Sequence, residues 1–324
     1  MARPKILLTR RWPEAVERRL AERYDASFNP ADRPMDAAGL GQALKDHDAL
    51  CPTVSDLIDA AVLEQARGGR ARILGNYGVG VNHIDLKAAA DLGLVVTNTP
   101  GVLTDATAEL AMTLALMAAR RAGEGERELR SGAWTGWRPT HNVGLQVTGA
   151  TLGLIGFGRI AQAMARMAHR GFGMKILYNS RRRAPPEIEA ETGASFRPEV
   201  DSLLADADFV SLHCPGGPET FHLIDERRLG LMKPTAFLIN TARGPVVDEA
   251  ALTAALKARR IAGAGLDVYE AEPKVTPELM GLDNVVLLPH LGSATVESRT
   301  AMGMKVADNL DAFFDGAEPP DRVA

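Results

Sequence analysis

The chain has 324 residues, 46% of them hydrophobic, and carries a formal net charge of −4. This length predicts two domains, each with enough residues to bury its own hydrophobic core. The weak negative charge gives no electrostatic reason to expect nucleic acid or a membrane surface as a partner.

The N-terminus and the cysteines narrow the class further. The segment MARPKILLTRR contains one short apolar run, which is too short for a signal peptide or a membrane span. Cys51 and Cys214 are the only cysteines and lie far apart, so neither a disulfide framework nor the spacing of a zinc site is available. We therefore expect a cytoplasmic protein without a metal ion.

The first hundred residues alternate between short β-rich runs and helical stretches. Residues 5–9, 48–51, 72–76 and 94–98 are the predicted strands, and residues 12–24 are one of the helices between them. This alternation is typical of α/β folds with a parallel sheet.

A long helix and a polar segment follow. Residues 104–121 are strongly helical in composition, and Thr104, Asp105 and Thr107 offer side-chain oxygens to the first amides of the helix. We expect this helix to connect two domains. Residues 123–132 are polar enough to form an exposed arm.

The second half repeats the α/β pattern and ends in a helix. Its predicted strands are residues 151–155, 174–179, 208–213, 236–240, 262–268 and 284–288. Residues 295–316 are amphipathic with helical spacing, so we expect the C-terminus to pack back on the first half of the chain.

A glycine-rich loop follows the first of these strands. Gly156-Phe157-Gly158-Arg159-Ile160-Ala161 matches the dinucleotide-binding pattern, with alanine in the third glycine position. It lies between a predicted strand and a predicted helix, the context in which amides at a helix start bind a pyrophosphate. Residues 156–160 are therefore predicted to bind a dinucleotide; a turn with only a structural role is the alternative.

The next strand end indicates which dinucleotide. An NAD site needs an acid about twenty residues after the glycine loop, yet the chain has Ser180, Arg181 and Arg182 there. These side chains suit the 2′-phosphate of NADP(H). We predict that NADP(H) is preferred and that NAD(H) is possible; a solvated basic turn without a cofactor role is the alternative.

Arg243, Glu272 and His290 each come just after a predicted strand. Ligands of parallel sheets bind at the carboxyl ends of the strands, so the three side chains could share one site. Arginine can grip a carboxylate, histidine can donate a proton near neutral pH, and a carboxylate beside the histidine favours its charged form. Glu270 is the competing partner for His290.

A second glycine-rich turn lies in the first half of the chain. In Tyr77-Gly78-Val79-Gly80 the glycines allow backbone amides to approach a small anion, so Val79 and Gly80 could donate to a substrate carboxylate. A tight turn that serves only the fold is the alternative.

Seven motifs together carry a family resemblance. They are NYGVGVNHIDL, TNTPGVLTDATAEL, WTGWRPT, LGLIGFGRIA, LINTARGPVVDE, AGLDVYEAEP and LPHLGSAT. The chain resembles the D-isomer-specific 2-hydroxyacid dehydrogenases and, within them, is most similar to the glyoxylate/hydroxypyruvate reductases.

The resemblance implies two Rossmann-like, doubly wound domains. Residues 1–100 plus 293–324 would form a split, flavodoxin-like substrate domain. Residues 101–292 would form the central NADP(H)-binding domain, including a dimerisation helix and arm at about 104–145. The expected assembly is a homodimer.

The resemblance also implies an activity, the NADPH-dependent reduction of glyoxylate to glycolate and of hydroxypyruvate to D-glycerate, with His290 as acid and base. Further cofactor contacts would be Thr104, Cys214, Pro215, Thr241, Ala242, Asp267 and Gly292. The substrate pocket would be lined by Leu50, Tyr77, Gly78, Val79, Gly80 and Trp137, with Arg243 and His290 also touching the substrate.

Alternatives remain within and outside this activity. The substrate could be phenylpyruvate, pyruvate or phosphoglycerate, the last disfavoured because little chain follows the C-terminal helix. A dinucleotide-sensing corepressor could use the same fold. Trp134 and Trp137 could simply be anchors of the dimer interface.

Overall fold

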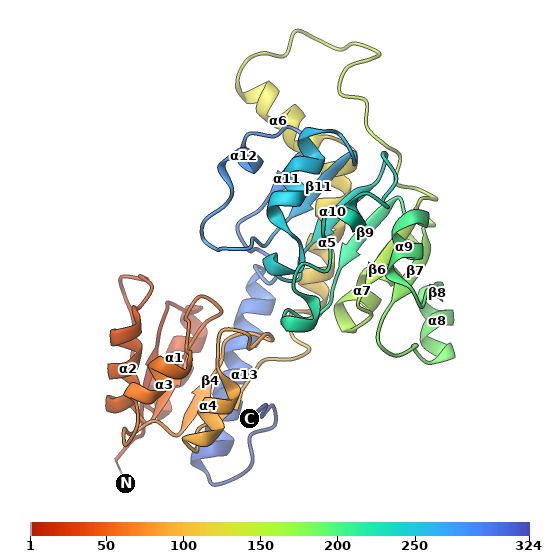
Figure 1. Ribbon diagram of the computed structural model, residues 1–324. Coiled ribbons are helices and arrows are strands. Elements are labelled where there is room, and N and C mark those ends of the chain that lie inside the picture. Colours follow the sequence, from red (N-terminus) through yellow and green to blue (C-terminus); the bar gives the residue numbers. More distant parts are fainter. Residues whose placement is uncertain (1) are drawn as a thin grey trace. The chain divides into compact units, whose positions relative to one another are not determined.

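The computed structural model describes residues 2–324 as two compact units. One unit runs to Leu103 and resumes over Ser293–Ala324; the other is Thr104–Gly292. Figure 1 shows α13, in blue, running among the red and orange elements of the first unit.

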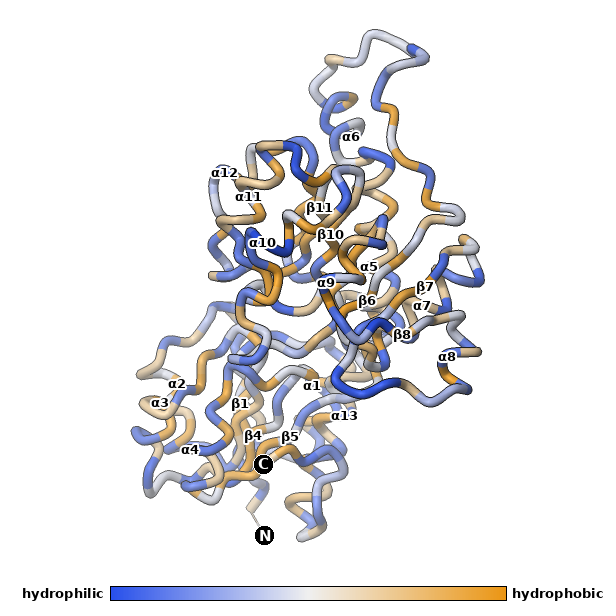
Figure 2. The backbone as a smooth tube through the Cα atoms, turned by 45° about the vertical axis from the view of Figure 1, so that its right-hand side comes forward, coloured by the Kyte–Doolittle hydropathy of each residue, from blue (hydrophilic) through white to orange (hydrophobic). Residues whose placement is uncertain are grey.

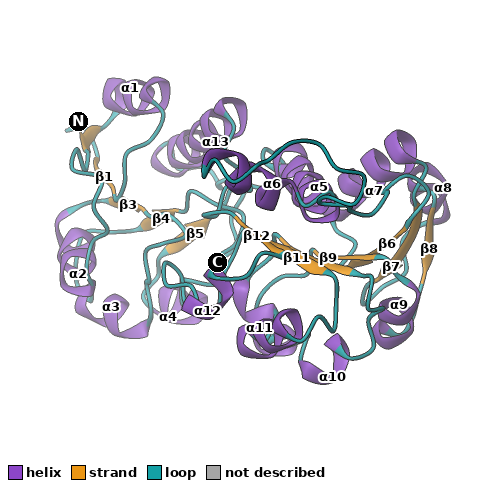
Figure 3. Ribbon diagram, turned by 90° about the horizontal axis from the view of Figure 1, so that it is seen from above, coloured by secondary structure: helices purple, strands orange, loops and turns teal. Residues whose placement is uncertain are grey.

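The first unit is built on a five-stranded parallel sheet with the order β2-β1-β3-β4-β5. Its strands are β1 (Lys5–Leu8), β2 (Asp25–Ser27), β3 (Ala49–Cys51), β4 (Ile73–Gly75) and β5 (Val95–Thr97). Its helices are α1 (Glu14–Arg23), α2 (Ala37–Asp46), α3 (Ala60–Gln65), α4 (Leu86–Asp91) and α13 (Val296–Phe314). Helices α1 and α13 cover one face and α2 to α4 the other (Figure 3), which is the flavodoxin-like arrangement.

The second unit is built on a seven-stranded parallel sheet with the order β12-β11-β10-β9-β6-β7-β8. Its strands are β6 (Thr151–Ile155), β7 (Lys175–Asn179), β8 (Ala194–Phe196), β9 (Phe209–Leu212), β10 (Phe237–Asn240), β11 (Gly263–Leu266) and β12 (Val285–Leu287). Counted from β6, this is the strand order of the dinucleotide-binding Rossmann fold. The predicted class of two doubly wound α/β domains is confirmed.

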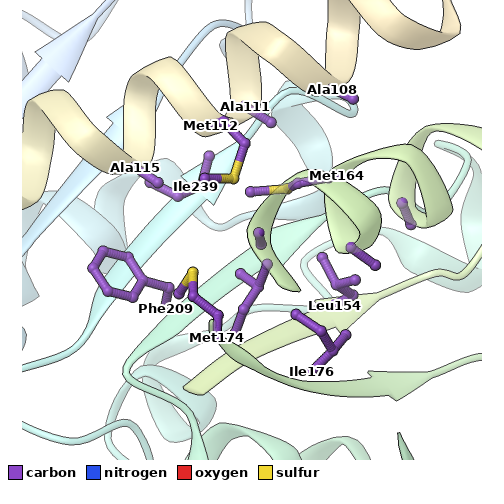
Figure 4. Close-up of a cluster of buried hydrophobic side chains, with 14 of the residues drawn as sticks. Ala108, Ala111, Met112, Ala115, Leu154, Met164, Met174, Ile176, Phe209 and Ile239 are labelled. Atoms are coloured by element: carbon purple, nitrogen blue, oxygen red, sulfur yellow. The ribbon is translucent and has the colours of Figure 1, made fainter. Parts of the chain in front are cut away.

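The helices of the second unit cover both faces of its sheet (Figure 3). They are α5 (Thr104–Ala119), α6 (Ala122–Arg130), α7 (Arg159–Phe172), α8 (Pro186–Thr192), α9 (Val200–Asp206), α10 (Glu226–Leu229), α11 (Glu249–Lys257) and α12 (Pro277–Met280), with 3₁₀ turns η1 (Pro218–Thr220) and η2 (Gly244–Val246). The core under α5 and α7 is rich in alanine and methionine, and Met112 and Met164 reach toward each other from the two helices (Figure 4). Small alanines allow the helices to pack closely, and methionines fill the remaining gaps.

The sequence missed two edge strands, β2 and β8. Their sequences are DAS and ASF, and neither contains an apolar run. Each nevertheless pairs in parallel with a long apolar neighbour, β1 and β7 respectively. An edge strand needs apolar residues on fewer sides, so its pattern is weaker.

The polar segment expected to be an arm is partly helical. Helix α6 covers Ala122–Arg130 and has no buried residue, and much of it is blue in the hydropathy colouring of Figure 2. Two ion pairs, Arg130 with Glu126 inside the helix and Arg121, just before it, with Glu124, stabilise this exposed helix, which has no side facing the core. The expected capping role of Thr107 also differs, because its hydroxyl donates to the carbonyl of Gly292 at 3.0 Å.

The two cysteines are free, Cys51 buried and Cys214 half-buried. Within residues 2–324, no helix is both long and apolar enough to cross a membrane. In the same residues, no three histidine, cysteine, aspartate or glutamate side chains are grouped so that they could hold a metal ion.

Candidate active site

The three candidate catalytic residues follow three strands that are neighbours in the second sheet. Arg243 comes after β10, Glu272 after β11 and His290 after β12. Because the strands are parallel, their carboxyl ends lie at one edge of the sheet, so the three loops meet there.

Asn240 shapes the turn that carries Arg243. Its side-chain nitrogen donates to the Arg243 carbonyl at 3.0 Å, and its side-chain oxygen accepts from the Ala242 amide at 3.0 Å. Sequence reasoning missed this residue, although an asparagine at a strand end is a known turn former. Burial lowers the pKa of Arg243, and the negative charge of Glu272 opposes that shift.

Gly244 lets the Arg243 turn pack against the β11 loop. A Cβ atom at this position would overlap the carbonyl group of Tyr269 and crowd the amide of Glu270. Only glycine permits this backbone contact. The contact brings the loop after β10 against the loop that carries Glu272.

Glu272 and His290 are joined by a hydrogen bond. Glu272 Oε2 accepts from His290 Nδ1 at 2.8 Å, and Glu272 Oε1 accepts from the Tyr269 amide at 3.0 Å. Burial acts to raise the pKa of Glu272, but the hydrogen bond and charge of His290, the Tyr269 amide and the charge of Arg243 outweigh it and lower the pKa. Glu272 is therefore ionised at neutral pH, with a carboxylate available to orient the imidazole.

Glu270 has a different partner. Its Oε1 lies 2.8 Å from Nε2 of His222. Of the two acids that competed for His290 in the sequence, the structure thus pairs Glu272 with it.

Asp267 holds the loop that carries His290. Its two oxygens accept from the amides of Leu291 at 2.6 Å and Gly292 at 2.8 Å. Burial raises the pKa of Asp267, while these two amides and the charge of His290 act in the opposite direction. The resemblance suggested a contact with the nicotinamide for Asp267 and Gly292; the structure gives both a part in shaping the loop. Thr107, through its bond to Gly292, is a further support that sequence reasoning missed.

The glycine loop has the geometry that a dinucleotide site requires. Gly156 has φ +86°, and a Cβ there would lie 2.6 Å from the Cys214 amide nitrogen, whereas a Cβ on Gly158 would meet open space. Gly158 is the N-cap of α7, and no side chain caps the helix. The first amides of α7 are thus available to a phosphate.

The buried hydroxyl of Thr241 is a second feature that suits a dinucleotide site. Thr241 Oγ1 is buried and has no hydrogen-bond partner within residues 2–324. A bound dinucleotide could supply that partner. The side chain of Phe157, by contrast, stacks on Tyr178 with ring centroids 3.9 Å apart, and its carbonyl accepts from the Gln162 side chain at 3.0 Å, so any cofactor contact of Phe157 would have to use its backbone amide.

The three arginines after β7 have different surroundings. Arg183 makes two bonds to Glu189, both 2.9 Å long. Arg181 is 85% exposed, and its guanidinium lies 3.6 Å from the Glu219 carboxylate. The Arg182 side chain is exposed, and its guanidinium has no ion pair within residues 2–324. The Ser180 hydroxyl donates to the Arg182 carbonyl.

The candidate substrate loop of the first unit is held by Asn76. Its amide nitrogen donates to the carbonyls of Gly78 at 3.0 Å and Gly80 at 3.1 Å, and its oxygen lies 2.9 Å from His83 Nε2. These carbonyls point at Asn76, and Val79, at the tip of the turn, is 36% exposed.

The predicted pocket residues differ in exposure. Leu50 is fully buried in the hydrophobic core, so its side chain offers no surface to a substrate. Tyr77 is also buried, its ring lies against that of Trp12 at a tilt of 39°, and its hydroxyl donates to the Arg299 carbonyl at 2.5 Å. Trp137 is 83% exposed.

The other predicted cofactor contacts all lie in the second unit. Thr104 begins α5, Cys214 and Pro215 follow β9, and Ala242 is buried in the turn after β10. Arg159 and Ile160 are the first residues of α7.

Comparison with known proteins agrees with this geometry. Residues 112–292 match the sequence model of the "D-isomer specific 2-hydroxyacid dehydrogenase, NAD binding domain" family. The glyoxylate reductase of Thermococcus onnurineus is 48% identical over 325 aligned residues, which cover 99% of this chain and 96% of the relative. A nicotinamide dinucleotide is therefore the cofactor class.

Solved structures match along the whole chain. A putative D-isomer specific 2-hydroxyacid dehydrogenase from Polaromonas has a TM-score of 0.92 and 38% identity, with 99% of both chains covered. An NADPH-dependent glyoxylate/hydroxypyruvate reductase from Sinorhizobium meliloti, solved with NADP and malonate, has a TM-score of 0.87 and 35% identity, covering 100% of this chain and 97% of that one. The family resemblance read from the motifs is confirmed: the chain belongs to the D-isomer specific 2-hydroxyacid dehydrogenases.

Proposed function

We propose that the chain is an NADPH-dependent reductase of small 2-oxo acids, converting glyoxylate to glycolate and hydroxypyruvate to D-glycerate. The observation that carries the proposal is the bond between His290 and Glu272, 2.8 Å long, beside the half-buried guanidinium of Arg243. The names of the Thermococcus and Sinorhizobium relatives support the same substrates.

The division of labour follows from the chemistry of reduction. Bound NADPH supplies a hydride for the carbonyl carbon of the substrate. Arg243 grips the substrate carboxylate with its fork of donors and polarises the carbonyl as negative charge develops on the oxygen. His290 gives that oxygen its proton. Glu272 accepts from His290 Nδ1, which orients the ring and leaves Nε2 to carry the transferred proton.

The cofactor preference rests on the turn after β7. Asn179 ends the strand, and the next three residues, Ser180, Arg181 and Arg182, bring no carboxylate. A carboxylate here would bind the ribose hydroxyls of NAD and repel a 2′-phosphate. The exposed guanidinium groups of Arg181 and Arg182 suit a phosphate instead.

We further assign residues 1–100 plus 293–324 as the substrate domain and residues 101–292 as the NADP(H)-binding domain. Val79 and Gly80 are proposed to donate their amides to the substrate carboxylate. Trp137 is proposed to narrow the pocket, which favours two- and three-carbon acids, although one methylene contributes only about 1–3 kcal/mol to such discrimination.

The deciding experiment follows the oxidation of NADPH and NADH by the purified protein with glyoxylate, hydroxypyruvate, pyruvate, phenylpyruvate and 3-phosphohydroxypyruvate. We expect the highest kcat/KM with NADPH and one of the two smallest polar acids. Preference for a bulky acid would overturn the substrate assignment, and preference for NADH the cofactor assignment. Binding of NADPH without turnover of any acid would favour a sensor.

The chemical roles have their own test. His290→Ala is expected to lower kcat by about 10²- to 10⁴-fold, as is usual for loss of a general acid. NADPH affinity, measured by fluorescence titration, should be retained. Normal turnover by this variant would rule His290 out as the proton donor.

A further inference from the structure

A buried carboxylate near the active site has no role in the chemistry described so far. Glu249 is the first residue of α11, is 8% exposed, and forms no ion pair within residues 2–324. Burying an ionised carboxylate is costly unless hydrogen bonds satisfy it. Its hydrogen bonds therefore show what it holds in place.

Both oxygens of Glu249 bind the segment that contains Glu272. Oε2 accepts from the Glu270 amide at 3.0 Å, and Oε1 accepts from the Thr276 amide at 3.0 Å and from the Thr276 hydroxyl. The two oxygens thus hold the two ends of residues 270–276. Bonds from amides to a carboxylate are charge-assisted and stronger than neutral ones.

The clamped segment is otherwise an exposed turn. Ala271, Glu272, Pro273 and Lys274 are all exposed, and the turn is closed by one backbone bond, from the Lys274 amide to the Ala271 carbonyl at 2.9 Å. Val275 is half-buried and packs on the core, and the Tyr269 amide donates to Glu272 Oε1 at 3.0 Å. The four exposed residues have little core packing of their own, so the position of Glu272 against His290 also depends on how the two ends of the turn are held.

We propose that Glu249 is a positioning residue of the active site, which holds the turn so that Glu272 meets His290 Nδ1. The proposal rests on the proposed function, since it acts through the Glu272–His290 pair. The competing explanation is that an acid in the first turn merely stabilises α11. Two observations contradict that explanation. Asp248 already caps α11 by accepting from the Ala251 amide, and the carboxylate oxygens of Glu249 accept from residues outside the helix.

The principal test is Glu249→Gln. Glutamine keeps the volume but has one oxygen, so its amide group must face the N–H of either Glu270 or Thr276 and one end of the turn is released. We expect kcat with NADPH and glyoxylate to fall about ten- to a hundredfold. We also expect the alkaline limb of the kcat/KM profile to move to lower pH, the direction expected for Glu272→Gln, with NADPH affinity retained.

The double variant separates positioning from general damage. If Glu249 acts through Glu272, adding Glu249→Gln to Glu272→Gln produces no further shift of the pH profile. Independent, additive shifts would overturn the proposal. An unshifted profile in Glu249→Gln would overturn it as well, whereas an unshifted profile in Glu272→Gln alone would instead overturn the proposed function.

Two more variants distinguish the proposed clamp from a general loss of stability. Asp248→Ala removes the cap of α11 and a 3.8 Å contact of Asp248 with His222, but it leaves the bonds of Glu249 to residues 270–276 in place, so it should lower thermal stability and leave the pH profile unchanged. A profile shifted by Asp248→Ala would mean that any loosening of α11 suffices, which contradicts a specific clamp. If Glu249→Gln does not fold, Thr276→Val cuts one of the same bonds from the other side; it should shift the profile in the same direction, and no shift would overturn the proposal.

Discussion

At the scale of single residues, the three arginines after β7 differ in whether a carboxylate of the same chain already holds their guanidinium group. Arg183 is engaged by Glu189 through two bonds, whereas Arg181 is 85% exposed, with its guanidinium 3.6 Å from Glu219, and the Arg182 side chain is exposed. An exposed guanidinium with at most a long ion pair can turn to a ligand phosphate more readily than one held by two short bonds.

This division leads to a prediction about cofactor choice. Arg181→Asp or Arg182→Asp should raise the KM for NADPH by about ten- to a hundredfold, because a phosphate-binding cation is replaced by a repelling anion. The KM for NADH should stay the same or fall. Arg183→Gln is the matched control and should leave the NADPH to NADH ratio unchanged. Equal loss with both cofactors would contradict the 2′-phosphate assignment.

The pH dependence is also set at the residue scale. The pKa of Glu272 is lowered from its ordinary value of 4.5, so the side chain stays ionised as the pH falls to 4.5. Protonation of Glu272 weakens its bond to His290 only at a still lower pH. The acid side of the kcat/KM profile should therefore stay flat to about pH 5. Removing the charge, as in Glu272→Gln, should move the alkaline limb by about one unit toward lower pH, because the carboxylate favours the protonated imidazole. A profile that Glu272→Gln leaves unmoved would show that this pair does not govern proton transfer.

Sequence reasoning at this scale identified residue types better than partners. The motifs LPHLGSAT and VYEAEP indicated a histidine and a carboxylate, and the family resemblance favoured Glu272, but Glu270 remained a competing partner for His290. Their partners, His222 and His290, became distinguishable only once the loops were placed in space.

At the scale of elements, the loop after β10 packs at Gly244 against the backbone of Tyr269 in the loop after β11, and this contact helps to place Arg243. Gly244→Ala should force the turn after β10 away from the carbonyl of Tyr269. Overpacking of this kind costs about 1–3 kcal/mol, and kcat should fall because Arg243 moves with the turn. Thermal unfolding and steady-state kinetics test both effects. Gly171→Ala, on an exposed part of α7 with open space around its Cβ, is the control and should be neutral or slightly stabilising.

The elements differ in how well the sequence predicted them. The apolar runs that form β6, β7, β9, β10, β11 and β12 were identifiable because central strands of a parallel sheet are buried on both faces. Helix α6 was expected only as an exposed arm, since it buries no residue and so lacks an apolar stripe.

At the scale of the whole molecule, the segment around α6 leaves large apolar side chains exposed. Leu129, Trp134, Trp137 and Val143 are exposed by 62%, 51%, 83% and 63%. Apolar side chains clustered on one exposed segment are typical of a surface that another protein covers. This observation supports the homodimer implied by the family resemblance.

We therefore expect the protein to be a dimer, and the double substitution Leu129→Ser with Trp134→Ser to shift it to a monomer. Light scattering coupled to size exclusion gives the mass directly. Met280→Ser, which removes a 58% exposed side chain on α12, is the control and should remain dimeric. A monomeric wild-type protein, or a dimer that survives the double substitution, would contradict an interface at this segment.

The sequence by itself determined the α/β class, the dinucleotide loop and the residue types of the catalytic trio. Those features are encoded within short stretches, where strand periodicity, glycine conformation and side-chain chemistry act locally. The tertiary structure decided which side chains meet: the His290–Glu272 bond joins residues 18 apart, and the Glu249–Glu270 bond joins residues 21 apart. It also placed the Leu50 side chain in the hydrophobic core. Such pairings depend on the order and register of neighbouring strands, which bring separate loops to one edge of the sheet and which no local pattern specifies.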